Sequence, residues 1–198
     1  MTPEQIEEHN RIYREAAHLA QGEIILQERR AAVSVDRSTR TNLERALKLF
    51  ARVLEIHPEN WSAMWFLGKI HQRLGNYPAA LTWFVGAHGI SPSQHGVTRE
   101  ASICAMHIGR SQDAFRYALA ALQAQPSNFG LQANLALALL LANRLDEAKS
   151  AIDISLVGDP SDVSSQTIRL MVQHFIAVGQ RPPSSTPELE VYWKTKIG

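Results

Sequence analysis

The chain has 198 residues, of which 45% are hydrophobic, and a formal net charge of +1. This length is enough for one good-sized domain, and the near-neutral charge excludes a whole-molecule attraction to DNA or to an anionic membrane. The most apolar run, LALALLLA at 135–142, is far shorter than the roughly 20 residues that a membrane span needs.

Cysteine usage and the first residues give an expectation about the compartment. The single cysteine, Cys104, has no partner for an intrachain disulfide, which suits a reducing environment. The first ten residues, MTPEQIEEHN, are acidic and polar and do not have the pattern of a secretory signal. We therefore expect a cytoplasmic protein without membrane insertion.

The first predicted element is a long N-terminal helix within residues 1–40. Thr2-Pro3-Glu4-Gln5 is typical of a helix start, and a helical pattern of apolar residues extends the helix to about residue 31. The segment 32–40, AVSVDRSTR, is predicted to be a loop. Thr41-x-x-Glu44 matches a capping box before the next predicted helix, LERALKLFARVLEI. The pattern of the N-terminal helix consists of Ile6, Tyr13, Ala17, Ala20 and Ile24.

A repeat of 34 residues organises the middle of the chain. An alanine precedes a proline by twelve residues four times, and each pair lies 34 residues from the next. Such a fixed period indicates stacked structural repeats. A small side chain lets two helices approach closely, and the proline ends the second helix. The pairs are Ala46–Pro58, Ala80–Pro92, Ala114–Pro126 and Ala148–Pro160.

Each repeat is predicted to contain two helices joined by a tight turn. Gly75, Gly109 and Asn143 occupy the same place in successive units, and these residue types adopt the left-handed conformation that ends a helix. After the last unit, GQRPPSST separates a lone helix from a short one, PELEVYWKTK, that Ser185 or Thr186 would cap. The predicted segments are 1–40 (N-terminal helix and loop), 41–178 (repeat domain, with a partial unit 41–60, full units 61–94, 95–128 and 129–162, and a capping helix 163–178) and 179–198 (Pro-rich linker and tail).

This pattern resembles the tetratricopeptide repeat, whose 34-residue unit has a W-x2-L-G-x2-Y first helix, an A-x3-F second helix and a closing proline. The unit 61–94 matches best, through Leu67-Gly68, Ala80-x3-Phe84 and Pro92. It departs from the family pattern at Met64 and His71, which stand where tryptophan and tyrosine are usual. The resemblance implies an all-α, right-handed α-solenoid of helix-turn-helix repeats, with an extended N-terminal helix and a C-terminal capping helix.

The resemblance also implies a protein-interaction role in which the first helices line a groove. Positions five, nine and thirteen of each unit should face that groove because they share one side of a helix. The side chains grade from basic to apolar, which favours an extended or helical segment of another protein. The predicted groove residues are Trp65, Lys69, Arg73, Arg99, Ile103, His107, Leu137, Leu141, Met171 and Phe175.

Three other functions are disfavoured by the residues. Some relatives bind the acidic tail of heat-shock chaperones, but here Glu100 would repel a carboxylate and only Asn134 has a suitable type in its place. The basic residues between Arg29 and Arg52 are largely offset by the acidic segment 1–28, which favours intramolecular ion pairs over nucleic acid.

Catalysis is the third. Cys104 and His107 are three apart on one predicted helix, but a metal site or a nucleophilic pair would need further groups. We interpret them as a packed thiol beside a groove histidine. His88 and His95, around Pro92, are interpreted as surface residues on a connection. We therefore expect no catalytic residue, no metal and no cofactor.

The sequence thus predicts a non-enzymatic scaffold or adaptor that binds a peptide or helix of another protein. Two alternatives stay open. The plan of an acidic N-terminal helix, about three repeats and a short tail is similar to that of type III secretion translocator chaperones, so a dedicated chaperone is one. A self-assembling structural protein, such as a homodimer joined through Trp65, Trp83 and the apolar half of the groove, is the other. The apolar half could also be filled by the chain's own tail.

Overall fold

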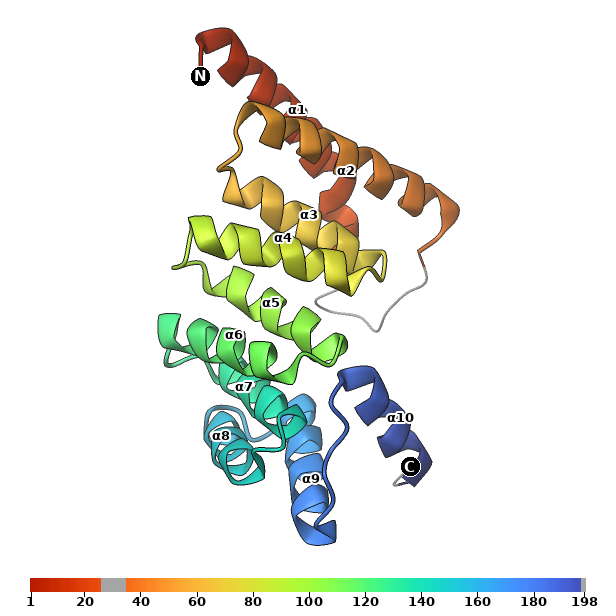
Figure 1. Cartoon of the computed structure of the whole chain (residues 1–198), viewed down its shortest axis with the longest axis vertical. Coiled ribbons are helices and arrows are strands. Elements are labelled where there is room, and N and C mark those ends of the chain that lie inside the picture. The colour runs from red at the N-terminus through yellow and green to blue at the C-terminus, as the bar shows by residue number, and fades with distance from the viewer. Residues whose placement is uncertain (26–34, 197–198) are drawn as a thin grey trace. The chain divides into compact units, whose positions relative to one another are not determined.

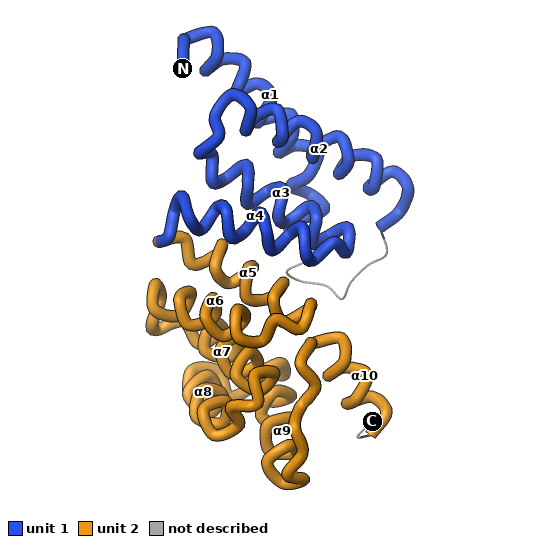
Figure 2. Tube along the Cα trace, in the orientation of Figure 1, with its two compact units in different colours: residues 1–92 blue, residues 93–198 orange. Residues whose placement is uncertain are grey.

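A computed structural model of the chain describes residues 1–25 and 35–196 (Figure 1). Within these ranges the regular structure is entirely α-helical, and none of the described helices has the length and apolar character needed to cross a membrane. The helices form two compact units, residues 1–92 and 93–198 (Figure 2). The helices are α1 (Pro3–Ile25), α2 (Arg37–Ile56), α3 (Trp61–Arg73), α4 (Tyr77–Ile90), α5 (His95–His107), α6 (Ser111–Ala124), α7 (Phe129–Leu141), α8 (Leu145–Gly158), α9 (Val163–Val178) and α10 (Thr186–Lys196).

The N-terminal unit contains two helix pairs. Helix α1 packs along α2 and also contacts α3, while α3 pairs with α4. Thus α1 takes the place of the first helix that the partial repeat 41–60 lacks, as the sequence predicts. The core of this unit consists of Ile12, Ala16, Ala20 and Ile24 of α1, Leu43, Ala46, Phe50 and Val53 of α2, and Ala63, Leu67 and Ile70 of α3.

Two expectations for this unit need correction. Helix α2 begins at Arg37, inside the predicted loop, because Asp36 caps it by accepting a hydrogen bond of 2.7 Å from the N–H of Thr39. The residues of the supposed capping box therefore lie within the helix, and the Thr41 hydroxyl donates to the carbonyl of Arg37. In α1, Ile6 is exposed, and the predicted extension from Ile25 to about residue 31 lies outside the described residues.

The C-terminal unit contains two further pairs, α5 with α6 and α7 with α8, followed by α9 and α10. Helix α7 contacts both α5 and α9, so these three first helices are neighbours. Buried serines bond across the helices: the Ser102 hydroxyl donates to the carbonyl of Ala114 at 2.9 Å, and Ser155 donates to that of Phe129 at 2.9 Å. Small side chains therefore join neighbouring helices by polar bonds as well as by close approach.

The turns and ends of the helices follow the 34-residue period. Gly75, Gly109 and Asn143 have φ angles of +80°, +76° and +59°, which confirms the predicted left-handed turns. Each proline of the lattice lies two residues beyond the end of a second helix, at α2, α4, α6 and α8. The side chains of Asn60, Asn128 and Asp162 cap α3, α7 and α9. The period in sequence is therefore a period in turn conformation and capping.

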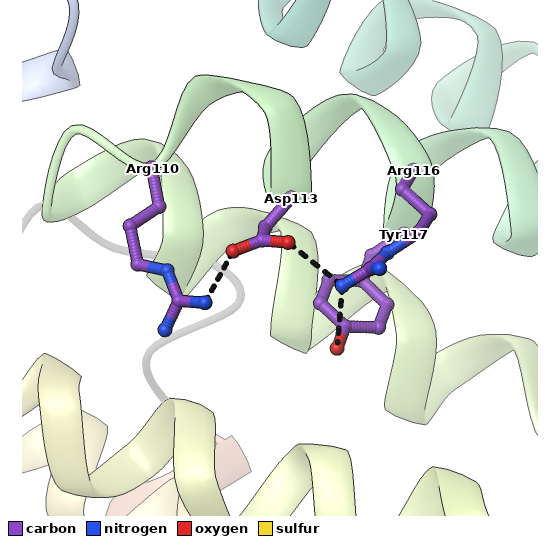
Figure 3. A network of polar contacts seen from close by, with 4 residues as sticks. All are labelled: Arg110, Asp113, Arg116 and Tyr117. Atoms are coloured by element: carbon purple, nitrogen blue, oxygen red, sulfur yellow. Dashed lines mark hydrogen bonds and ion pairs between the residues drawn. The ribbon is translucent and has the colours of Figure 1, made fainter.

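The second helices begin in two different ways. Asn76 caps α4 with its side chain, whereas Arg110 and Arg144 stand at the corresponding positions of α6 and α8 and make no side-chain cap. Each arginine instead forms an ion pair with an acidic residue three positions on, Asp113 or Glu147. Figure 3 shows Asp113 between Arg110 and Arg116, with the guanidinium of Arg116 near the Tyr117 hydroxyl. Helix α6 therefore starts within an exposed ionic cluster.

Candidate functional site

The ten predicted groove residues all lie on first helices, but they are divided between the two units. Trp65, Lys69 and Arg73 lie on α3 of the N-terminal unit. The other seven lie in the C-terminal unit: Arg99, Ile103 and His107 on α5, Leu137 and Leu141 on α7, and Met171 and Phe175 on α9.

In the N-terminal unit, the side chains on α3 are already engaged. Trp65 is half-buried, and its ring meets that of Phe66 edge-on with a centroid distance of 5.1 Å. Lys69 is only 3% exposed, and the side chain of Arg73 is 9% exposed and lies 3.6 Å from the carboxylate of Glu23 in α1. The basic part of the predicted surface is therefore largely buried and has partners within the chain.

In the C-terminal unit, the two polar groove residues of α5 lie close to carboxylates. The guanidinium of Arg99 lies 3.5 Å from the buried carboxylate of Glu100. Burial lowers the pKa of His107, and the charge of Glu190 in α10 acts in the opposite direction. Since Glu190 belongs to the C-terminal helix, its effect on His107 indicates that α10 reaches α5.

Helix α10 lies over the surface formed by α5, α7 and α9, which we call the α5–α7–α9 face. It contacts α5 directly, and Ser184, just before α10, approaches Gly109 just after α5. The hydroxyl of Tyr192 lies 3.0 Å from Nε2 of His174 in α9, and the Tyr192 ring lies 5.1 Å from that of Phe175. Leu189 is the buried anchor of the helix, at 2% exposure.

The apolar residues predicted for the groove lie under or beside this helix. Leu141 and Phe175 are fully buried, whereas Leu137 and Met171 are half-buried. A cavity of about 340 Å³ remains next to α10. It is lined by Leu137 of α7, by Val163, Ser164, Thr167, Ile168 and Met171 of α9, and by Thr186, Leu189 and Glu190 of α10. The α5–α7–α9 face thus has an apolar depression that α10 covers incompletely.

The tail residues that complete this surface were not among the predicted site residues. The short helix at PELEVYWKTK was predicted, and the Ser185 hydroxyl accepts from the N–H of Glu188 at 3.4 Å, in agreement with the predicted cap. Neither Leu189 nor Tyr192 falls on the 34-residue period, and so no repeat position marks them as partners of α9. The pairing of aromatic side chains in 192–193 with a lone first helix was the available signal.

The cysteine and histidines that were weighed for chemistry are dispersed. Cys104 is buried in α5 with His107 three residues further on. His88 lies within α4 and His95 begins α5, so the expectation that they lie on a connection is wrong. Across residues 1–25 and 35–196, no group of three or more His, Cys, Asp or Glu side chains is arranged to hold a metal ion.

Comparison with solved structures places the fold among tetratricopeptide proteins. YrrB, described as a TPR protein with an unusual peptide-binding site, has a TM-score of 0.63 and 17% identity, with 80% of each chain covered. A MamA structure has a TM-score of 0.64 and 12% identity over 96% of this chain and 98% of MamA. A fragment of MamA from Desulfovibrio magneticus RS-1 gives 0.61 and 17% over 93% and 98%. At these identities the likeness shows the fold alone.

The sequence itself matches a family model. The tetratricopeptide repeat model matches residues 35–95 and 105–163, which together are more than half of the chain. No curated protein sequence shows a significant match. The matched segments contain the turns, small residues and prolines of the 34-residue period, as well as the helix pairs from α2 to α8. The chain therefore belongs to the tetratricopeptide repeat family.

Proposed function

We propose that this protein is a non-enzymatic scaffold or adaptor whose α5–α7–α9 face binds a peptide or a helix of another protein. One observation carries the proposal: this face already holds a short helix, α10, through the buried side chain of Leu189 and the contacts of Tyr192. A surface that accommodates an internal helix has the width and apolar depth to accommodate an external one.

The family supports the coarser part of this proposal. The tetratricopeptide fold is a protein-interaction scaffold, and such domains are generally not enzymatic. One similar structure is a mutant of the O-GlcNAc transferase of Thermobaculum terrenum, but this chain covers only 27% of that protein. A tetratricopeptide segment can therefore be part of an enzyme, and our proposal for this chain rests on its own surface.

The chemistry of the face favours an amphipathic segment. Leu137 and Met171 supply apolar contacts at the cavity, while Thr167 and Ser164 place hydroxyl groups among them. Apolar anchors would provide most of the affinity, and the hydroxyl groups would help to fix the register. An extended peptide or a helix with apolar residues on one side fits this lining.

A capture experiment tests the proposal. Wild-type protein, Leu137→Asp and the control Val157→Asp would be immobilised and exposed to native lysate, after circular dichroism has shown that all three are folded. Val157 is 79% exposed on α8, so its substitution adds the same charge away from the cavity. We expect a protein to be retained by wild type and by Val157→Asp, and lost with Leu137→Asp.

The retained protein would then be purified and titrated against the three forms by calorimetry. A loss of at least tenfold in affinity on Leu137→Asp alone supports the proposal. Equal affinity for all three forms, or capture of the same proteins by all three, would show that the α5–α7–α9 face is not the binding surface.

A further inference from the structure

We propose that α10 is a displaceable occupant of the α5–α7–α9 face, which must leave before an external ligand binds. We further propose that the ligand is a short amphipathic helix with the same aliphatic and aromatic anchors, and with an additional apolar residue that fills the cavity beside α10. The part that concerns an external ligand rests on the function proposed above.

The hold of α10 on the face is narrow. Among its described residues, Leu189 alone is buried, whereas Val191, two positions on, is 62% exposed. Helix α7, of similar length, buries eight residues. Tyr192 and Trp193 are half-buried and contribute ring contacts with His174 rather than a packed core. One aliphatic anchor and one aromatic pair hold this helix, and so it can detach without opening the core.

The connection to α9 permits such a movement. Gly179 ends α9 in the left-handed conformation, with a φ of +64°, and a Cβ atom there would meet nothing within 4 Å. Between Gln180 and Ser184, the backbone makes no hydrogen bond to any other segment that the structure describes. Since this connection is not bonded into the repeat, release of α10 leaves the hydrogen bonds of α9 intact.

The cavity indicates what a better ligand would contain. Thr186 and Leu189 of α10 line its wall, three residues apart, and Tyr192 follows after three more. These spacings put the three side chains along one side of a helix. Leu189 and Tyr192 are anchors, but Thr186 is short and leaves the 340 Å³ cavity next to it unfilled. An aliphatic residue at the position of Thr186 would complete an apolar stripe of three.

Competition with α10 has a measurable consequence. A segment tethered by a short flexible connection acts at an effective concentration on the order of millimolar. An external helix of equal intrinsic affinity therefore binds the open form more tightly than the closed form, by the ratio of open to closed populations. The apparent affinity of the full chain should thus rise when α10 is released.

The probe is a fluorescently labelled peptide of residues 180–196 of this chain, titrated against full-length proteins by anisotropy. The proteins are wild type, Leu189→Asp, which places a carboxylate at the buried anchor, and the control Val191→Asp on the exposed side of the same helix. We expect Leu189→Asp to bind the peptide at least tenfold more tightly than wild type or Val191→Asp. A second peptide with Thr186→Leu should bind Leu189→Asp at least fivefold more tightly than the first.

Two results would overturn the proposal. If folded Leu189→Asp binds the peptide no better than wild type, α10 is not an exchangeable ligand. If the Thr186→Leu peptide binds no better than the native one, the cavity does not select the ligand. These outcomes do not depend on an external protein, so a positive peptide result with no partner retained by the face would contradict only the proposed function.

Hydrogen exchange of the wild-type chain covers the case in which Leu189→Asp does not fold. The amides of residues 187–196 should exchange at least tenfold faster than the central amides of α5, α7 and α9, because α10 opens without the rest of the unit. Exchange of α10 at the same rate as these helices would make it an integral part of the core and would refute displacement.

Discussion

Phe84 of α4 occupies the space beside Gly68 of α3, where a Cβ atom would lie 2.6 Å from Cε1 of the phenylalanine ring. Both residues are buried, and Phe84 is fully enclosed. Gly68→Ala should therefore lower the free energy of unfolding by about 1–3 kcal/mol through overpacking. Urea denaturation followed by circular dichroism measures this change.

Gly89 provides the matched control for that substitution. It also lies in a helix, α4, but a Cβ atom there would meet nothing within 4 Å. Gly89→Ala should leave stability unchanged or raise it by up to about 1 kcal/mol, since alanine favours the helix. If Gly68→Ala behaved in the same way, the close approach of α3 and α4 at this point would be disproved.

A pair of serines links α8 to α9. The Ser155 hydroxyl donates to the carbonyl of Phe129, and its oxygen lies 3.1 Å from that of Ser165, with both side chains buried. Ser155→Ala should cost about 1–2 kcal/mol, because two buried hydrogen bonds are lost. A double-mutant cycle with Ser165→Ala should give a coupling of about 0.5 kcal/mol or more by chemical denaturation. Strict additivity would argue against the bond between the two hydroxyls.

The start of α9 should contribute a pH-dependent part of the stability. The hydroxyl and N–H groups of Ser165 lower the pKa of the Asp162 carboxyl below 3.8, and the N–H donates at 2.7 Å. Because the folded pKa is the lower one, this contribution is present above pH 3.8 and is lost as the pH falls through the folded pKa. Thermal unfolding at several pH values from 7 to 2 measures it.

Two substitutions at Asp162 separate the cap from the charge. Asp162→Ala should cost about 1 kcal/mol at pH 7, as is typical for loss of an N-cap. Asp162→Asn keeps a capping oxygen but has no carboxyl to titrate, so the difference between wild type and this variant should shrink on acidification. A difference that stays constant down to pH 2 would contradict the assigned pKa shift.

Leu137 and Leu141, one turn apart on α7, should respond very differently to the same charge. Leu141 is 1% exposed, and so Leu141→Asp buries a carboxylate and should cost about 4 kcal/mol or more. Leu137 borders the cavity, and Leu137→Asp should cost only about 1–2 kcal/mol. Denaturation midpoints of the two variants provide the test. Similar losses would place both side chains in the core.

The period of 34 residues made the repeat predictable, because the same backbone problem recurs in each unit. Gly75, Gly109 and Asn143 show this well: each must adopt a positive φ, and each has a residue type that does so readily. The start of α2 was less predictable. Thr41 and Glu44 have the residue types of a capping box, but Asp36 caps the helix earlier, and a local motif cannot reveal which of two caps is used.

The candidate site was only partly predictable for a related reason. Repeat position places a residue on a first helix, but burial depends on what packs there later in the chain. Arg73 meets Glu23 of α1, and Phe175 is covered with the help of Tyr192 from α10. Both covering elements lie outside the 34-residue period, so their contacts follow from tertiary packing rather than from any spacing in the sequence.

The replacement of the Asn76 cap by Arg110 and Arg144 gives the chain an uneven response to ionic strength. Hydrogen bonds from a neutral amide cap are almost indifferent to added salt, whereas exposed pairs such as Arg110–Asp113 and Arg144–Glu147 are screened by it. Concentrated electrolyte should thus fray the first turns of α6 and α8 while sparing that of α4. One repeat design therefore gives helix ends that differ in their dependence on the surrounding ions.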